Sequence, residues 1–236
     1  MRVFKIAFGS TLALGCIGVV MLKLGHLEVQ RLNAQVESLE KEKVQLGEYI
    51  KRLSASRRVA QADCLRQTTD DHGRIHSLIR WLEIAPDGTL GEPQSLETLG
   101  ELVYFEAAVI KFTSESIAAA EPGRTTSLAL FRRIFGDMQT PALVANLEPF
   151  IYSNETQAET KEHERLWELF WQMMEDPALA ERYNVRVAQV EAPAVRVRAG
   201  QIFEVSLDAA GGLNVKLIGR RDDVPTSKRT ITAASG

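Results

Sequence analysis

Several kinds of residue are scarce in this chain, and each scarcity excludes a class of protein. The 236 residues include only two cysteines, Cys16 and Cys64, and four histidines. Two cysteines exclude a disulfide-stapled framework, which a chain of this length does not need in order to fold. The formal net charge is −3, so the chain lacks the basic character of nucleic-acid-binding proteins. We therefore expect no nucleic-acid partner.

The short motifs of common catalytic and cofactor sites are also missing. The sequence contains no Gly-x-x-x-x-Gly-Lys phosphate loop, no Gly-x-Ser-x-Gly nucleophile elbow and no Cys-x-x-Cys pair. Gly211 and Gly212 are interpreted as part of a turn and not as a phosphate cradle. We expect a protein that is not an enzyme and that holds no cofactor.

A long apolar run is present at the N-terminus. A basic leader, residues 1–5, precedes about 17 uncharged residues, which is the lower limit for a membrane-spanning helix. Residues 6–24 are therefore predicted to form a transmembrane helix, with the membrane as a partner. The basic leader favours a cytoplasmic N-terminus and an extracytoplasmic remainder. The expected localisation is a bacterial inner membrane, crossed once.

Two other interpretations of this segment stay open. Leu12 to Cys16 fits a permissive lipobox, in which Cys16 would be lipidated, and a cleaved signal peptide is the third possibility. The apolar run continues past Cys16 to Leu22, whereas a processed lipoprotein continues into a polar tether. The uncleaved anchor is preferred for that reason.

Residues 25–62 carry a heptad pattern that predicts a parallel coiled coil. β-Branched residues at a with leucine at d favour two parallel strands. The pattern lasts about four heptads, which distinguishes it from an ordinary amphipathic helix. The predicted oligomerisation residues are Val29, Val36, Lys43 and Ile50 at a, and Leu32, Leu39, Leu46 and Leu53 at d.

The partner of this helix is not fixed by the pattern. Few complementary charges occupy the e and g positions, so a homodimer and a heterodimer both stay open. Packing of the helix on the chain's own distal domain is a further alternative. Cys64, just beyond the predicted coil, is interpreted as a free or buried thiol, with an interchain disulfide as the alternative.

Residues 65–220 are predicted to form an α+β domain that is mostly helical. Apolar residues at helical spacing predict helices within 75–82, 96–118 and 128–136, and Thr140 with the following proline predicts another. A capping-box pattern opens a further predicted helix at 154–157, which ends at Asp176.

The pattern then changes to a period of two. Alternating apolar residues between Val185 and Leu217 predict a small antiparallel β meander, with a hairpin turn at 208–212. Residues 221–236 are polar and unpatterned, and we expect them to be disordered.

Candidate chemistry in the distal domain is sparse. His72 and His76 are four residues apart beside Asp70 and Asp71, a spacing that can hold a metal on a helix. Solvated surface histidines explain them better, so no metal site is expected. The polar run Glu159, Glu162, His163 and Glu164 is interpreted as an exposed helix face. Three basic pairs are interpreted as solvated charge: Arg132-Arg133, Arg196 with Arg198, and Arg220-Arg221. Trp167 and Trp171 are interpreted as core residues.

The order of leader, span, coil and outer domain is similar to that of bitopic assembly proteins of bacterial envelopes, such as division-complex coiled-coil proteins. The resemblance covers roughly the first 60 residues and implies a membrane-anchored scaffold that presents its distal domain to other envelope proteins. Two alternatives stay open: an extracytoplasmic sensor or ligand-binding module, and a metal-dependent hydrolase using His72 and His76.

Overall fold

The computed structural model describes the backbone of residues 2–85, 87–147 and 157–221, and the side chains in these ranges from His26 onward except Leu27. The chain divides into two compact units, residues 1–50 and 51–236, and each is considered by itself. The predicted disordered tail lies outside the described residues, apart from Arg221.

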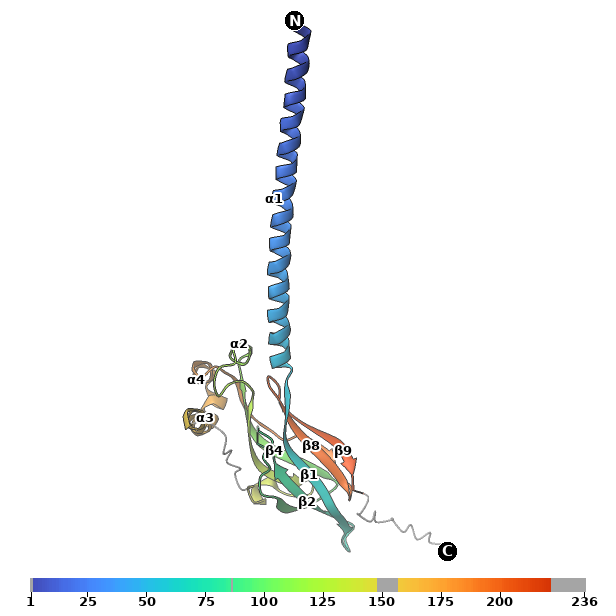
Figure 1. The fold of residues 1–236 in the computed structure, drawn as a ribbon. Coiled ribbons are helices and arrows are strands. Elements are labelled where there is room, and N and C mark those ends of the chain that lie inside the picture. The colour runs from blue at the N-terminus through green and yellow to red at the C-terminus, as the bar shows by residue number, and fades with distance from the viewer. Residues whose placement is uncertain (1, 86, 148–156, 222–236) are drawn as a thin grey trace, which may run out of the picture. The chain divides into compact units, whose positions relative to one another are not determined.

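The first unit is almost entirely one helix, α1, which spans Arg2–Leu53 (Figure 1). The predicted helical segment is confirmed as far as Leu53. The predicted limit of residue 62 is wrong, because the chain turns at Ala55 and enters a strand at Ser56. No coiled coil is formed in the described part of this single chain, and that element of the expected fold is corrected.

Residues 6–24 belong to the backbone of α1, and their side chains, including that of Cys16, lie outside the described set. Over the part of the chain that the structure describes, no helix combines the length and the apolar character that a membrane crossing needs. This finding contradicts the predicted span, the membrane partner and the inner-membrane localisation that depended on it.

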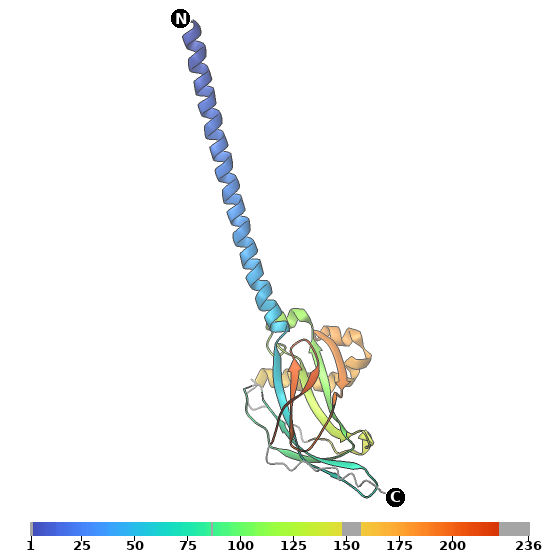
Figure 2. The ribbon, with the colours of Figure 1, turned by 90° about the vertical axis from the view of Figure 1, so that its right-hand side faces the viewer.

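The second unit is built mainly from antiparallel strands (Figure 2). The strands are β1 (Ser56–Thr69), β2 (Ile75–Glu83), β3 (Gln94–Leu99), β4 (Leu102–Phe112), β5 (Leu128–Gly136), β6 (Val185–Glu191), β7 (Ala194–Arg196), β8 (Gln201–Asp208) and β9 (Leu213–Arg220). One sheet has the order β3-β2-β1-β8-β9, and the other has the order β5-β4-β6, with β7 also pairing with β4. The short helices are α2 (Ser114–Ala118), η1 (Pro141–Leu143) and α4 (Pro177–Arg182), and the longer one is α3 (Gln157–Glu175).

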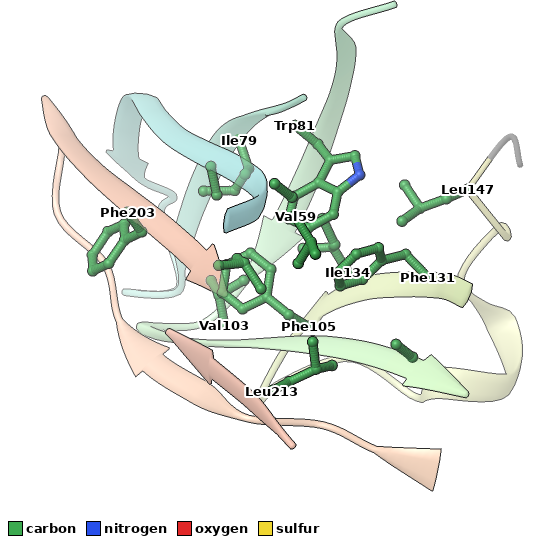
Figure 3. Close-up of a cluster of buried hydrophobic side chains, with 14 of the residues drawn as sticks. Val59, Ile79, Trp81, Val103, Phe105, Phe131, Ile134, Leu147, Phe203 and Leu213 are labelled. Atoms are coloured by element: carbon green, nitrogen blue, oxygen red, sulfur yellow. The ribbon is translucent and has the colours of Figure 1, made fainter. Parts of the chain in front are cut away.

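The main core lies between the two sheets (Figure 3). Alternate residues of each strand point inward, as the pleat requires. Trp81 from β2, Phe105 from β4 and Phe203 from β8 belong to this core, and Trp81 and Phe105 are fully buried. The indole of Trp81 stacks on Phe105 with ring centroids 5.8 Å apart and meets Phe131 edge-on at 4.7 Å. The two sheets therefore form a β-sandwich.

A second core covers the outer face of the β5-β4-β6 sheet. Ile110 and Phe112 of β4 pack there with Leu166 and Phe170 of α3. β4 is thus apolar on both faces: one face meets the opposite sheet, and the other meets the helices. The unit has three layers, namely helices, the smaller sheet and the larger sheet.

The expected domain, mostly helical with one small β meander, is wrong. The predicted helices within 75–82 and 128–136 are β2 and β5, and the one within 96–118 is β3 and β4 followed by the short helix α2. For β4 the physical reason is two-sided burial, because a strand covered on both faces shows apolar residues on both faces and loses its alternation. In β2, apolar Leu78 and Leu82 lie on the partly exposed face, so the sequence imitates helical spacing. The helix that ends near Asp176 is confirmed as α3, although residue 154 lies outside the described residues. The helix predicted after Thr140 is only a single turn of 3-10 helix, η1.

The strands predicted after Val185 are confirmed, but they do not form one meander. β6 and β7 join β4 in the smaller sheet, whereas β8 and β9 join β1 in the larger sheet. The turn at 208–212 is confirmed by the hydrogen bond from the Asp208 amide to the Gly212 carbonyl.

Candidate functional site

One face of α1 carries a stripe of exposed apolar side chains. Six of the eight predicted oligomerisation residues form it, each between 53% and 63% exposed. We call this set the α1 stripe: Val29, Leu32, Val36, Leu39, Leu46 and Ile50.

The remaining two predicted residues differ from the stripe. Lys43 is exposed and interrupts the apolar row. Leu53 is partly buried and packs against the second core of its own domain. Off the stripe, Glu37 and Lys41 form an ion pair one helical turn apart at 2.7 Å, with both side chains about 70% exposed. The helix is therefore amphipathic, with its apolar face open to solvent.

A second exposed surface lies where α3 crosses the outer face of the smaller sheet. A groove of about 140 Å³ is lined by Ala108 of β4, Leu130 and Arg132 of β5, and Trp167, Phe170 and Trp171 of α3. We call it the α3 groove. Ala108 and Leu130 are direct partners in the β4–β5 register, so they form one continuous apolar floor.

The charged wall of the α3 groove is Arg132. Its guanidinium carbon lies 5.2 Å from the ring centroid of Trp171, which is a cation–π geometry. Trp171 is 54% exposed and also meets Phe170 edge-on at 5.1 Å. The interpretation of Trp171 as a core residue is wrong, whereas Trp167 does pack against the second core.

Glu106 lies beside this wall and is shared by two arginines. Its Oε1 accepts hydrogen bonds from Arg133 Nε at 2.9 Å and Nη2 at 2.6 Å, but it lies 4.0 Å from Arg132 Nη1. Arg133 also donates to the Pro141 carbonyl oxygen at 2.7 Å. Arg133 is thus fully engaged, whereas Arg132 is held mainly by stacking on Trp171.

His72 lies in the turn between β1 and β2, and His76 lies near the start of β2. Residues 70–74 form the β1–β2 hairpin turn, so His72 and His76 are not on a helix. Asp70 accepts hydrogen bonds from the amides of His72 and Arg74 and from the Arg74 side chain, and its Oδ2 lies 3.2 Å from His76 Nε2. Desolvation opposes these bonds, but together they hold the pKa of Asp70 well below its usual range. The carboxylate therefore serves to fix the turn.

The polar run on α3 is likewise structural. Glu162 pairs with Arg124, and His163 Nε2 donates to the Gly123 carbonyl oxygen at 2.9 Å. These contacts tie α3 to the loop before β5. Across the described residues, no group of three or more His, Cys, Asp or Glu side chains is arranged to hold a metal ion.

Cys64 and Glu83 are buried titratable groups whose pKa is raised. Cys64 is a free thiol in the main core, which confirms the interpretation as a buried thiol, and burial raises its pKa to about 11. Glu83 is 6% exposed, and burial raises its pKa to about 7 despite a hydrogen bond from the Trp81 indole at 3.4 Å. Periodicity could not have identified Glu83, since a charged residue at a strand end normally points to solvent.

Sequence patterns identified the α1 stripe but not the α3 groove. Arg132 and the two tryptophans stand out by residue type, yet the sequence does not show that β5 and α3 bring them together. Ala108 and Leu130 carry no signal except that they are apolar. Comparisons with protein families, with curated proteins and with solved structures give no match to this chain.

Proposed function

We propose that the protein is an assembly scaffold, in which the α1 stripe pairs with the same stripe of a second copy and the β-sandwich domain is presented to protein partners. The observation that carries the proposal is the exposure of six apolar side chains, 53–63% each, along one face of one helix. Large contiguous apolar surfaces on soluble units mark sites of association. Burying a leucine or valine side chain fully stabilises by about 1.5–3 kcal/mol, so a stripe of six can support a stable pair.

A second copy fits the stripe better than an unrelated surface. Because apolar residues recur at spacings of three and four, two such helices can interdigitate along their whole length. Lys43 in the middle of the row can extend its ammonium to solvent from a two-helix pair, whereas a larger bundle would bury it. The stripe therefore favours association of two chains.

Leu39→Lys tests the proposal in the full-length chain, with Leu39→Lys/Leu46→Lys as the stronger variant. A charge in the pairing face is costly to bury, so we expect the single variant to raise the dimer Kd at least about tenfold and the double variant to be monomeric at micromolar concentration. Sedimentation equilibrium should report about twice the 26.2 kDa chain mass for the unmodified protein.

Val44→Lys is the matched control. Val44 and Leu39 are both 63% exposed on α1, but Val44 lies off the stripe, so its substitution should leave the dimer Kd unchanged. A monomeric unmodified protein at micromolar concentration would refute self-association. Equal weakening by Val44→Lys and Leu39→Lys would show that the stripe is not the pairing face.

A further inference from the structure

The α3 groove contains a cation whose hydrogen-bonding capacity is unused. A guanidinium offers five N–H donors, and among the described residues Arg132 makes no side-chain hydrogen bond. Glu106, whose Oε1 lies 4.0 Å from Arg132 Nη1, is already held by two hydrogen bonds from Arg133. Among the described residues, Arg132 therefore keeps its N–H donors available for a further acceptor at the groove wall.

The groove combines this charge with an apolar floor. Trp171 and Arg132 form one wall, and Ala108, Leu130 and Phe170 form the floor. Tryptophan and arginine are the residues that most often dominate the binding energy of protein interfaces. A volume of about 140 Å³ is close to that of an apolar cavity of about 150 Å³ that accepts a benzene ring. The space thus suits a single aromatic side chain.

We propose that the α3 groove binds a partner-protein segment in which an aromatic side chain stands next to a carboxylate. The ring occupies the space between Trp171 and Leu130, and the adjacent Asp or Glu accepts hydrogen bonds from Arg132. A carboxylate suits this position because a guanidinium can donate two parallel hydrogen bonds to it. The proposal rests on the scaffold function and adds the chemistry of the partner segment that the domain binds.

The test uses the full-length chain and a synthetic heptapeptide amide, acetyl-Gly-Ser-Asp-Phe-Asp-Ser-Gly. We expect it to shift the indole N–H resonances of Trp167 and Trp171 in a saturable titration at up to millimolar concentration. Two control peptides replace both Asp by Asn or the Phe by Ala. Each should bind at least about tenfold more weakly, because one removes the charge and the other removes the ring.

Arg132→Gln should weaken binding of the Asp-Phe-Asp peptide at least about tenfold and abolish its preference over the Asn-Phe-Asn peptide. Arg66→Gln is the matched control, since Arg66 is an exposed arginine on β1 of the other sheet and should not affect the titration. Trp171→Ala, at a half-exposed position, should remove binding without unfolding the domain.

Three outcomes would overturn the proposal. The first is the absence of peptide-induced shifts at the two indoles. The second is equal binding of the acidic and amide peptides, or an unchanged Kd in Arg132→Gln. The third is binding of N-acetylphenylalanine without binding of any peptide, which would indicate a small-molecule ligand.

Repeating the titration in Leu39→Lys/Leu46→Lys separates this proposal from self-association. We expect the monomeric variant to retain peptide binding, because the groove lies wholly within the sandwich domain. Indole shifts that depend on protein concentration without peptide, and that persist in this variant, would instead assign the groove to a second copy and overturn the proposal.

Discussion

The helix α1 and the sandwich domain use the same apolar residue types in opposite ways. On α1, Val, Leu and Ile side chains of the stripe are more than half exposed, whereas in the domain Val109, Ile110 and Leu207 are fully buried. The domain satisfies its apolar surface internally, through two cores. The described part of α1 exposes its own, so its apolar face is available to another chain. The domain therefore buries its apolar residues against one another, whereas the described part of α1 leaves its apolar stripe exposed.

The largest expected effect is the loss of folding stability when a buried aromatic ring is removed, compared with removal of an exposed leucine. Phe105→Ala removes a fully buried ring that stacks on Trp81, and we expect it to lower the free energy of unfolding of the domain by about 3–5 kcal/mol. Leu39→Ala on α1 should lower it by less than about 0.5 kcal/mol. Urea unfolding followed by tryptophan fluorescence measures both. Similar losses in the two variants would break the comparison.

The next effect concerns a buried carboxyl group in the domain. Burial raises the pKa of Glu83 to about 7 when folded, against 4.5 in the unfolded chain, so the folded state binds the extra proton between these values. The unfolding free energy should therefore fall as pH rises from 4.5 to 7, and it should level off above 7. Glu83→Gln should flatten this window and stabilise the domain by about 3 kcal/mol at pH 8.

Urea unfolding at a series of pH values tests this expectation. Glu40→Gln, at an exposed position of α1, is the matched control and should leave the pH profile of the domain unchanged. A Glu83→Gln variant with the same pH slope as the unmodified protein would exclude Glu83 as its source.

The smallest expected effect is the difference in folding stability between alanine substitutions at two glycines. A Cβ on Gly136 would lie 2.5 Å from the carbonyl carbon and 2.9 Å from the amide nitrogen of Leu99, so backbone must move. We expect Gly136→Ala to destabilise the domain by about 1–3 kcal/mol. A Cβ on Gly47 of α1 meets nothing within 4 Å, so Gly47→Ala should raise the thermal stability of the helix, by about 0.5–1 kcal/mol. Circular dichroism during heating distinguishes the two, and effects of the same sign would contradict the assignment of crowded and open sites.

The spacing of apolar residues predicted the correct helix or strand wherever one face of that element is exposed or partly exposed to solvent. The amphipathic α3, with Leu166 and Phe170 buried on one side, was predicted with its C-terminal end. The same holds for β8, whose residues alternate between buried and partly exposed. In both elements the periodicity of the sequence is the periodicity of the environment.

The spacing of apolar residues predicted helices in place of strands where apolar residues occupy both faces of the strand. β2 buries Ile79 and Trp81 inward and keeps Leu78 and Leu82 partly covered on the other face, which imitates helical spacing. β4 is buried over most of its length, because one of its faces meets the larger sheet and the other meets the helices. Predicting β4 would have required knowing that the larger sheet and α3 cover its two faces.

The sequence by itself determined the helix α1 as far as Leu53, the apolar stripe along it, the helix α3 and the strands after Val185, because the apolar residues of each follow the period of a helix or a strand. Only the tertiary structure decided that residues 56–136 form strands of a sandwich, that Glu83 and Cys64 are buried, and that Arg132 meets Trp171 in a groove. Those features depend on strands and helices distant in sequence, and the spacing of residues within one segment does not show which distant segment will cover it.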